Sequence, residues 1–269
     1  MSGAVGRRAM GRTITLAVSV LVAVLLGGRG AVVEAQSTLR VAAYNVKHGL
    51  GMDGRIDLER IADVLRPLGA DVITLQEIDR GAERTGGVDQ AATLGALLGM
   101  SAHFGAFMPY QGGAYGMAVL TRLPVVAVND VRLPDGEEPR TALEVQVAVG
   151  VEGRTVSVVG IHLYRTPEER RAQADSLSAY LDSIEHPVVL AGDFNSQRGD
   201  VVLRTLTEQD WFVVDKTDDP ATFPSDTPAR EIDFVMLRPA SAFEVVEHRV
   251  LAETLASDHR PLLFVVRLW

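Results

Sequence analysis

The stretch VVLAGDFNSQRGD, residues 188–200, joins a continuous aliphatic run to a cluster of polar residues and glycines. An apolar run without alternation is typical of a strand covered on both faces, so its end opens at the edge of a core. Asp193 and Asn195 follow directly at that end. Two interpretations fit this stretch alone: an Asx turn, in which Asp and Asn bond their own backbone beside glycine, or a rigidly held functional site.

Composition favours one large domain with its own core. The chain has 269 residues, of which 47% are hydrophobic, and it shows no internal repeat, low-complexity tract or long linker, so we expect a single domain over residues 37–269. The chain contains no cysteine. This excludes disulfides, thiolate zinc sites and cysteine nucleophiles.

The first 35 residues have the form of a secretory signal. Arg7, Arg8 and Arg12 precede an apolar run of 13 residues, 14–26, and Val33 and Ala35 then have the small-residue spacing of a cleavage site. We therefore expect residues 1–35 to be a cleaved signal peptide and the mature protein to be secreted or periplasmic. A membrane anchor is the alternative, although a span needs about 20 residues. The arginine pair leaves twin-arginine export open.

The mature chain is acidic. The formal net charge is −9, and because residues 1–35 carry four Arg and one Glu, the remainder carries −12. Such a chain has no bulk electrostatic reason to bind DNA or an anionic membrane tightly, although local basic patches remain open.

Strand-like runs alternate with a few helical patterns along residues 37–269. Helical periodicity is expected over residues 57–68, 89–98, 167–184 and 201–206, and the third begins with the capping-box residues Thr166 and Glu169. Many strands with few amphipathic helices predict an α+β fold, a four-layer αββα sandwich in which two mixed sheets pack face to face under outer helices. The apolar runs are LRVAAYN, DVITLQE, YGMAVLT, ALEVQVAV, TVSVVGIHL, PVVLAGDFN, EIDFVML and PLLFVVRL.

Strand after strand in this pattern begins or ends at a polar residue that can bind a metal or carry a proton. Because strand ends can converge on one rim of a sandwich, we expect these side chains to meet there. Glu77, Asp258 and the Asn45 amide offer oxygen ligands for a hard cation, Mg²⁺ or also Mn²⁺. The full set is Asn45, Glu77, His162, Asp193, Asn195, Asp233, Asp258 and His259.

The remaining members of this set suit proton transfer. Asp233 would orient His259 as a general base if the fold brings the two together, and the Asn195 amide could donate to an oxyanion. A metal, an oriented base and neutral donors fit the attack of water on phosphorus. A zinc site using His162 and His259 is the alternative, but the two lack helical spacing and a thiolate partner.

The motifs, in their order along the chain, resemble the endonuclease/exonuclease/phosphatase superfamily, which includes deoxyribonuclease I and neutral sphingomyelinases. They are YNVKHG, LQEID, YGMAVLTR, GIHLYRTPEERRAQ, AGDFNS, EIDF and SDHRPL. The resemblance spans nearly all of the mature chain and implies the αββα sandwich. It also implies that Asn45, Glu77 and Asp258 belong to the metal site, and that Asp193 and Asn195 position the water and bind a phosphoryl oxygen.

By the same resemblance, His162 contacts the phosphate or donates a proton, and Asp233 orients His259. Arg140 lies where many members carry an arginine that faces the phosphate; a solvated arginine at a strand start is the alternative. Arg165 is a further candidate for substrate binding. The chain departs from many relatives in carrying Met117, after Gly116, where they have asparagine, so a polar contact in the substrate pocket is in doubt.

These features predict an exported, Mg²⁺-dependent hydrolase of phosphoric esters, a phosphodiesterase for small or lipid-headgroup substrates, acting as a monomer without a stable membrane span. A secreted nuclease would need a basic groove and salt-dependent binding. A sphingomyelinase-like enzyme would need an exposed apolar loop at the rim. Residues 104–117 are the candidate for it, although core strand and loop is the interpretation that we favour for them. A catalytically silent binding module is the non-enzyme alternative.

Overall fold

Two six-stranded sheets form the centre of the protein. The structure, a computed structural model, describes residues 37–208 and 210–269; the expected signal peptide lies outside these residues. The first sheet has the order β11-β12-β1-β2-β4-β3. Its strands, in chain order, are β1 (Ser37–Asn45), β2 (Val72–Arg80), β3 (Ser101–Tyr110), β4 (Gly113–Thr121), β11 (Phe243–Val250) and β12 (Leu262–Leu268).

The second sheet has the order β5-β6-β7-β8-β10-β9. Each sheet is mixed, because β1 pairs with β2 and β7 pairs with β8 in parallel while the other neighbours are antiparallel. The strands of the second sheet are β5 (Val125–Arg132), β6 (Thr141–Val149), β7 (Arg154–His162), β8 (Val188–Asp193), β9 (Phe212–Val213) and β10 (Asp233–Arg238).

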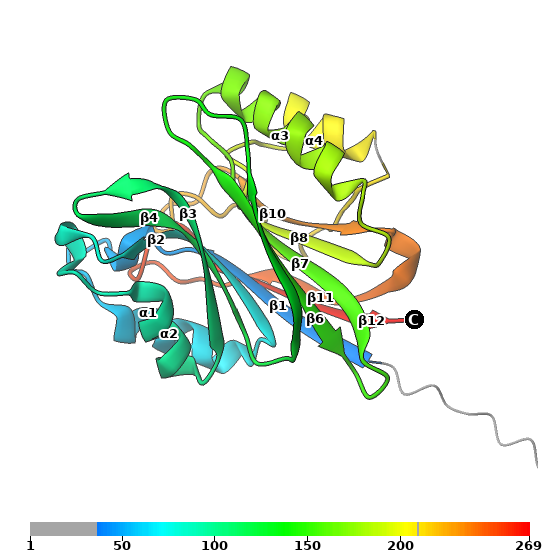
Figure 1. Ribbon diagram of the computed structural model, residues 1–269, viewed down its shortest axis with the longest axis horizontal. Helices are drawn as coiled ribbons and strands as arrows, with labels where there is room; N and C mark the ends of the chain where they lie inside the picture. Colours follow the sequence, from blue (N-terminus) through cyan, green and yellow to red (C-terminus); the bar gives the residue numbers. More distant parts are fainter. Residues whose placement is uncertain (1–36, 209) are drawn as a thin grey trace, which may run out of the picture. The chain divides into compact units, whose positions relative to one another are not determined.

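The helices cover the outer faces of the two sheets (Figure 1). The ends of the helical patterns shift by a few residues from their expected places. Short 3₁₀ turns occupy Lys47–Gly49, Arg66–Leu68, Glu83–Thr85 and Ala240–Ala242. The first sheet carries α1 (Leu58–Leu65) and α2 (Gln90–Leu98), and the second carries α3 (Pro167–Leu181) and α4 (Val201–Thr207).

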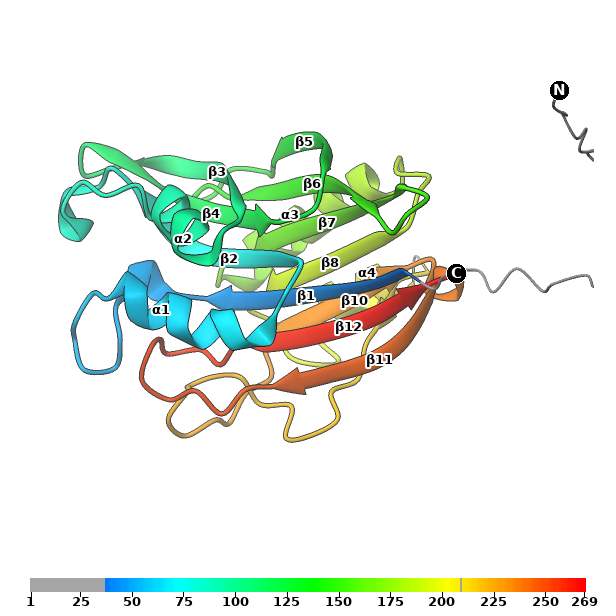
Figure 2. The same cartoon turned by 90° about the horizontal axis from the view of Figure 1, so that it is seen from below.

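Three layers of apolar side chains hold these four layers of structure together. A central layer between the sheets includes Val41, Val145 and Phe264. A second layer joins the first sheet to α1 and α2, and a third joins the other sheet to α3 and α4. Figure 2 shows α1 lying across the outer face of the first sheet. The predicted αββα sandwich is therefore confirmed.

The expected capping box at the start of α3 is wrong. Thr166 is the N-cap residue, but its side chain makes no capping hydrogen bond. Glu169 instead accepts from the backbone N–H of Glu137 at 3.1 Å. Its carboxylate therefore pairs with the loop between β5 and β6 and not with the N-terminus of its own helix. No helix among residues 37–208 and 210–269 is long and apolar enough to cross a membrane.

Candidate active site

The strand pairing brings the polar strand ends together. Asn45, His162 and Asp193 are the last residues of β1, β7 and β8, and Asp233 is the first residue of β10. In the second sheet His162 lies opposite Asp193, which in turn lies opposite Asp233. Three of the predicted residues are therefore lateral neighbours across three strands, because β7 and β8 run parallel and β10 runs against them.

Unusual backbone geometry aims two of the site residues. Glu77 is the extra residue of a β-bulge in β2, and it has φ +59°. Asn195 has φ +48°. Non-glycine residues in this left-handed region are strained and persist only where the surrounding fold holds them, which is common at functional sites.

A cleft with a volume of about 320 Å³ opens over these strand ends. Asn45 and Asp233 lie outside its lining: Asn45 contacts Glu77 and Asp193, and Asp233 contacts His259. All ten candidate residues predicted from sequence thus lie in or directly beside one cleft. The cleft is lined by Glu77, Tyr115, Glu138, Arg140, His162, Tyr164, Arg165, Asn195, Asp193, Phe223, Asp258 and His259.

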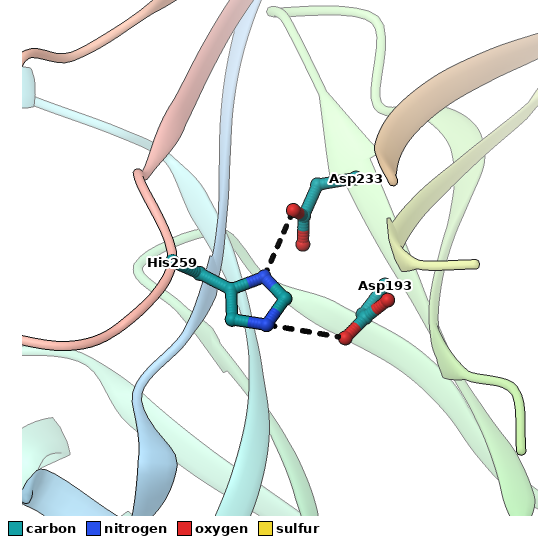
Figure 3. Close-up of side chains that lie close together, drawn as sticks. All are labelled: Asp193, Asp233 and His259. Carbon is teal, nitrogen blue, oxygen red and sulfur yellow. Dashed lines mark hydrogen bonds and ion pairs between the residues drawn. The ribbon is translucent and has the colours of Figure 1, made fainter. Parts of the chain in front are cut away.

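His259 lies between two carboxylates (Figure 3). Its Nδ1 is 2.9 Å from Asp233 Oδ2, and its Nε2 is 3.6 Å from Asp193 Oδ2. Burial lowers the pKa of His259, but the two carboxylates outweigh that effect and the pKa is raised. Burial and the nearby Asp233 raise the pKa of Asp193. The arrangement joins an oriented imidazole to a buried carboxylate across a short gap.

His162 approaches the same carboxylate, but its pKa is shifted in the opposite direction from that of His259. Its Nε2 is 3.5 Å from Asp193 Oδ2, and its side chain is buried. Burial, together with Arg140 and His259, holds its pKa well below the usual value, so the ring is neutral at pH 7. Its buried Nδ1 has no hydrogen-bond partner among the described residues.

The donor set on the first sheet fits a hard divalent cation. Asn45 Nδ2 donates to Glu77 Oε1 and to Asp193 Oδ2, at 3.1 Å in both cases. Burial, and to a smaller extent the charge of Asp258, raise the pKa of Glu77. Lys47 Nζ lies 2.7 Å from Asp258 Oδ2. Carboxylate and amide oxygens are the ligands that Mg²⁺ accepts.

A second group of possible ligands overlaps the first. Ligand atoms of Asp193, Asp233 and His259 lie within 4.8 Å of one another. We favour Glu77 and Asp258 as the residues that would hold an ion, because the 2.9 Å hydrogen bond from His259 Nδ1 occupies Asp233 and His259 Nε2 already pairs with Asp193 at 3.6 Å. A hard cation also prefers oxygen to imidazole.

Arg140 is held among aromatic rings. The residue is 4% exposed, and its guanidinium lies 4.6 Å from the centre of the Phe107 ring and 5.4 Å from that of Tyr164. Its Nη1 pairs with Glu138. The alternative of a solvated arginine is wrong, because the rings and Glu138 replace water. Arg165 is exposed and lines the cleft.

Sequence reasoning missed several lining and supporting residues. Tyr115, Glu138, Tyr164 and Phe223 line the cleft, and as ordinary loop or strand residues they carry no chemical signature of their own. Arg170 is a support, since its Nη1 contacts the backbone oxygen of Asn195. The one signal in the sequence that could have indicated this role is the helical periodicity of α3, which determines the side of the helix on which Arg170 lies.

Met117, the departure from many relatives, is not among the residues that line the cleft. It is fully buried and belongs to the apolar layer between the two sheets. Its methionine therefore adds apolar packing beneath the site and offers no polar group to a substrate.

The model of the Endonuclease/Exonuclease/phosphatase family matches residues 42–259. The chain belongs to this family. Family members are typically phosphoester hydrolases and generally depend on a divalent metal ion.

Individual relatives agree with the family. The chain is 27% identical over 249 residues to a protein of Escherichia coli K12 named "Uncharacterized protein YbhP", which covers 87% of this chain and 98% of that one. A solved endonuclease/exonuclease/phosphatase structure from Beutenbergia cavernae is 28% identical, with a TM-score of 0.70, over 86% of this chain and 72% of that one.

A more distant structure shows the same fold. ANGEL2, described as a 2′,3′-cyclic phosphatase in complex with adenosine-2′,3′-vanadate, has a TM-score of 0.70 at 15% identity. The match covers 87% of this chain and 96% of that one.

Proposed function

We propose that the protein is an exported phosphodiesterase that uses Mg²⁺ or Mn²⁺ to hydrolyse small or lipid-headgroup phosphodiesters. The observation that carries this proposal is the row from Asp233 through His259 to Asp193, at 2.9 Å and 3.6 Å, in a cleft that also contains Arg140. This row can move a proton while a guanidinium faces a phosphoryl oxygen.

Each side chain has a place in this reaction. Glu77 and Asp258 would hold the metal ion, with Asn45 beside them, and the bound ion would supply charge stabilisation at phosphorus. Asp193 Oδ2 would accept the proton of the attacking water, and the Nε2–H of charged His259, 3.6 Å away, would stabilise the Asp193 carboxylate before that transfer. Neutral His162 donates toward the phosphate or leaving group.

Size and charge favour a compact substrate. The cleft of about 320 Å³ matches a small ligand. Glu138 beside Arg140 offsets positive charge at the rim, and the chain without residues 1–35 carries −12. A long polyanion needs several cationic phosphate contacts, and its binding weakens steeply with salt. The proposal also takes the mature protein to be a secreted or periplasmic monomer.

One observation favours a lipid headgroup among the small diesters. Residues 104–117, the candidate for that apolar loop, are mostly strand, and several of them pack into the core. Met52, Ile56 and Leu255 instead expose 43%, 43% and 45% of their surfaces. Met52 N donates to Leu255 O at 2.8 Å, so two loops join there. The second loop leads directly to Asp258 at the cleft.

A substrate panel tests the function. Mature protein is assayed at about 0.15 M salt with Mg²⁺, Mn²⁺ or chelator, on bis(p-nitrophenyl) phosphate, 2′,3′-cyclic AMP, p-nitrophenyl phosphate, sphingomyelin vesicles and plasmid DNA. The cyclic ester is included because ANGEL2 is described as acting on that class. We expect metal-dependent kcat/KM to be highest for a small or vesicle-borne diester, expressed per phosphodiester.

The outcomes separate the alternatives. Efficient plasmid degradation with inert small esters would identify a nuclease, and preference for p-nitrophenyl phosphate would identify a monoesterase. Binding of phosphoesters without turnover, equal in wild type and His259→Ala, would identify a silent binding module. Each of these results would contradict the proposed phosphodiesterase function.

A further inference from the structure

A lysine with no solvent-exposed side-chain surface lies behind the Asp233–His259 pair. Lys216 follows β9, and its side chain is 0% exposed. Its Nζ donates to Glu231 Oε1 at 2.6 Å and to the main-chain oxygen of Asp233 at 2.8 Å. The ring centre of Phe234 lies 4.5 Å from the same nitrogen. Burying an ammonium is costly, so these contacts must offset its desolvation.

Lys216 completes the hydrogen bonding of the Asp233 main chain. The N–H of Asp233 donates to Thr222 Oγ1 at 3.4 Å. On one side β10 pairs with β8 through Asp193, but on the other side β9 pairs only with Met236 and Leu237. The ladder on the β9 side therefore stops before Asp233, and Lys216 supplies a donor to its carbonyl there.

The lysine is itself held in place on both sides. Val214 N donates to Val235 O in β10 at 3.0 Å, and Thr217 N donates to His248 O in β11 at 2.8 Å. The two-residue segment between these two anchors, Asp215 and Lys216, has little freedom to move. The ammonium is consequently presented to Asp233 by the backbone of two different strands.

The same network reaches the loop that follows β8. Glu231 Oε2, the oxygen that Lys216 does not use, accepts from Arg198 Nε at 2.8 Å. Arg198 lies three residues after Asn195. Removal of the lysine would leave Glu231 paired with Arg198, whereas removal of Arg198 would leave the bond from Lys216 to Asp233 in place. The chain therefore offers a test variant and a matched control in one network.

We infer that Lys216 is a positioning residue: it fixes the main chain of Asp233 so that the Asp233 carboxylate holds the Nδ1–H of His259 and aims Nε2 at Asp193. This inference rests on the proposed function, because Lys216 affects the reaction only through Asp233 and His259. A buried ion pair with Glu231 that stabilises the fold and nothing else is the competing explanation.

A double-mutant cycle on the full mature protein distinguishes the two explanations. We expect Lys216→Met to lower kcat about 10-fold with KM changed less than about 2-fold. In an Asp233→Asn background the same substitution should lower kcat by less than about 2-fold, because residues that act through one another are non-additive. Arg198→Gln should leave kcat within about 2-fold of wild type. Equal effects of Lys216→Met in both backgrounds would overturn the inference.

A spectroscopic arm does not depend on turnover. The imidazole proton shared by His259 Nδ1 and Asp233 should give a proton NMR signal far downfield of the amides, which Asp233→Asn removes. We expect Lys216→Met to weaken or shift this signal while Arg198→Gln preserves it. An unchanged signal in a folded Lys216→Met protein contradicts the inference even if no substrate is turned over, and Lys216→Gln replaces the methionine variant if that one does not fold.

The two proposals fail in different ways. A wild-type protein that hydrolyses no ester but loses the signal on Lys216→Met keeps the positioning role and overturns the proposed function. If the wild-type protein hydrolyses diesters and Lys216→Met has a normal kcat, the proposed function is kept and the positioning role of Lys216 is overturned.

Discussion

His162 and His259 both approach Asp193 Oδ2, yet the pKa of one ring is lowered and that of the other is raised. Burial, together with the Arg140 guanidinium and the His259 imidazole, lowers the pKa of His162 well below the usual value. His259 meets two carboxylates, and its pKa is raised. One site therefore contains a neutral and a charged imidazole at 3.5 Å and 3.6 Å from the same carboxylate, which suits two different proton-transfer roles.

At the scale of single residues, His259→Ala should lower kcat by at least about 10²-fold, the usual effect of removing a positioned acid or base. Asp233→Asn should be nearly as damaging, because it removes the acceptor that orients Nδ1. Both are measured as kcat under saturating metal, with circular dichroism as the check on folding. A silent Asp233→Asn would show that the hydrogen bond at 2.9 Å does not serve the reaction.

Glu77→Gln should weaken Mn²⁺ binding at least about 10-fold, because a neutral amide is a poor ligand for a hard cation. The free energy of unfolding without metal should stay the same or rise, since burial opposes the charge of this carboxylate. Isothermal titration calorimetry measures the affinity. Glu83→Gln, an exposed carboxylate away from the cleft, is the matched control, and equal affinities in the two variants would exclude Glu77 as a ligand.

At the scale of the elements, β8 places its aspartate by passing very close to β7. Gly192 has φ +147°, and a Cβ at this position would lie 2.2 Å from the backbone oxygen of Ile161. Only glycine allows the strand to reach Asp193 in this register. The glycine in AGDFN is thus part of the site, although it touches no substrate.

Gly192→Ala should therefore lower the free energy of unfolding by more than about 2 kcal/mol, since it adds a backbone clash to an unfavourable φ. Gly199→Ala is the control: its φ is +85° and a Cβ there meets nothing within 4 Å, so the cost should be limited to about 1 kcal/mol. Urea unfolding at pH 7 measures both. Equal losses would mean that the contact with Ile161 relaxes freely.

The elements also show how far the sequence could predict the fold. Eight strands were expected from apolar runs, and each of them is present; β3, β5, β9 and β11 were not anticipated. All four are edge strands, at the ends of the two sheets. An edge strand buries less of its surface, as the exposed alternate residues of β5 show, so it lacks the apolar run that marks an interior strand.

The site was predictable for a related reason, and only in part. Metal ligands and proton carriers must be particular residue types at interior strand ends, so Asn45, Glu77 and Asp193 could be chosen from the sequence. Lys216 and Arg170 act through backbone oxygens, a role that any long cationic side chain could fill. Such residues are found only once the chain is folded in space.

At the scale of the whole molecule, one buried histidine away from the cleft links stability to pH. His248 in β11 is 1% exposed, and its Nδ1 lies 3.1 Å from Val214 O. Burial, followed by the charge of Lys216, lowers its pKa to about 3. In the unfolded chain a histidine has a pKa of about 6.5, so folding holds this ring neutral over a wide acidic range.

The sign of the pH effect follows from these two pKa values. Below a pH of about 6.5 His248 is protonated in the unfolded chain but stays neutral in the folded chain. The free energy of unfolding therefore decreases as the pH falls from this value toward 3. The loss approaches about 1.4 kcal/mol per pH unit. His248→Asn keeps an amide donor near Val214 O and removes the titration. Between pH 7 and pH 5, urea unfolding should show the free energy of unfolding of wild type decreasing by about 1–2 kcal/mol more than that of the variant, because every other titrating group is common to both proteins. Equal decreases would mean that His248 is protonated in the folded state.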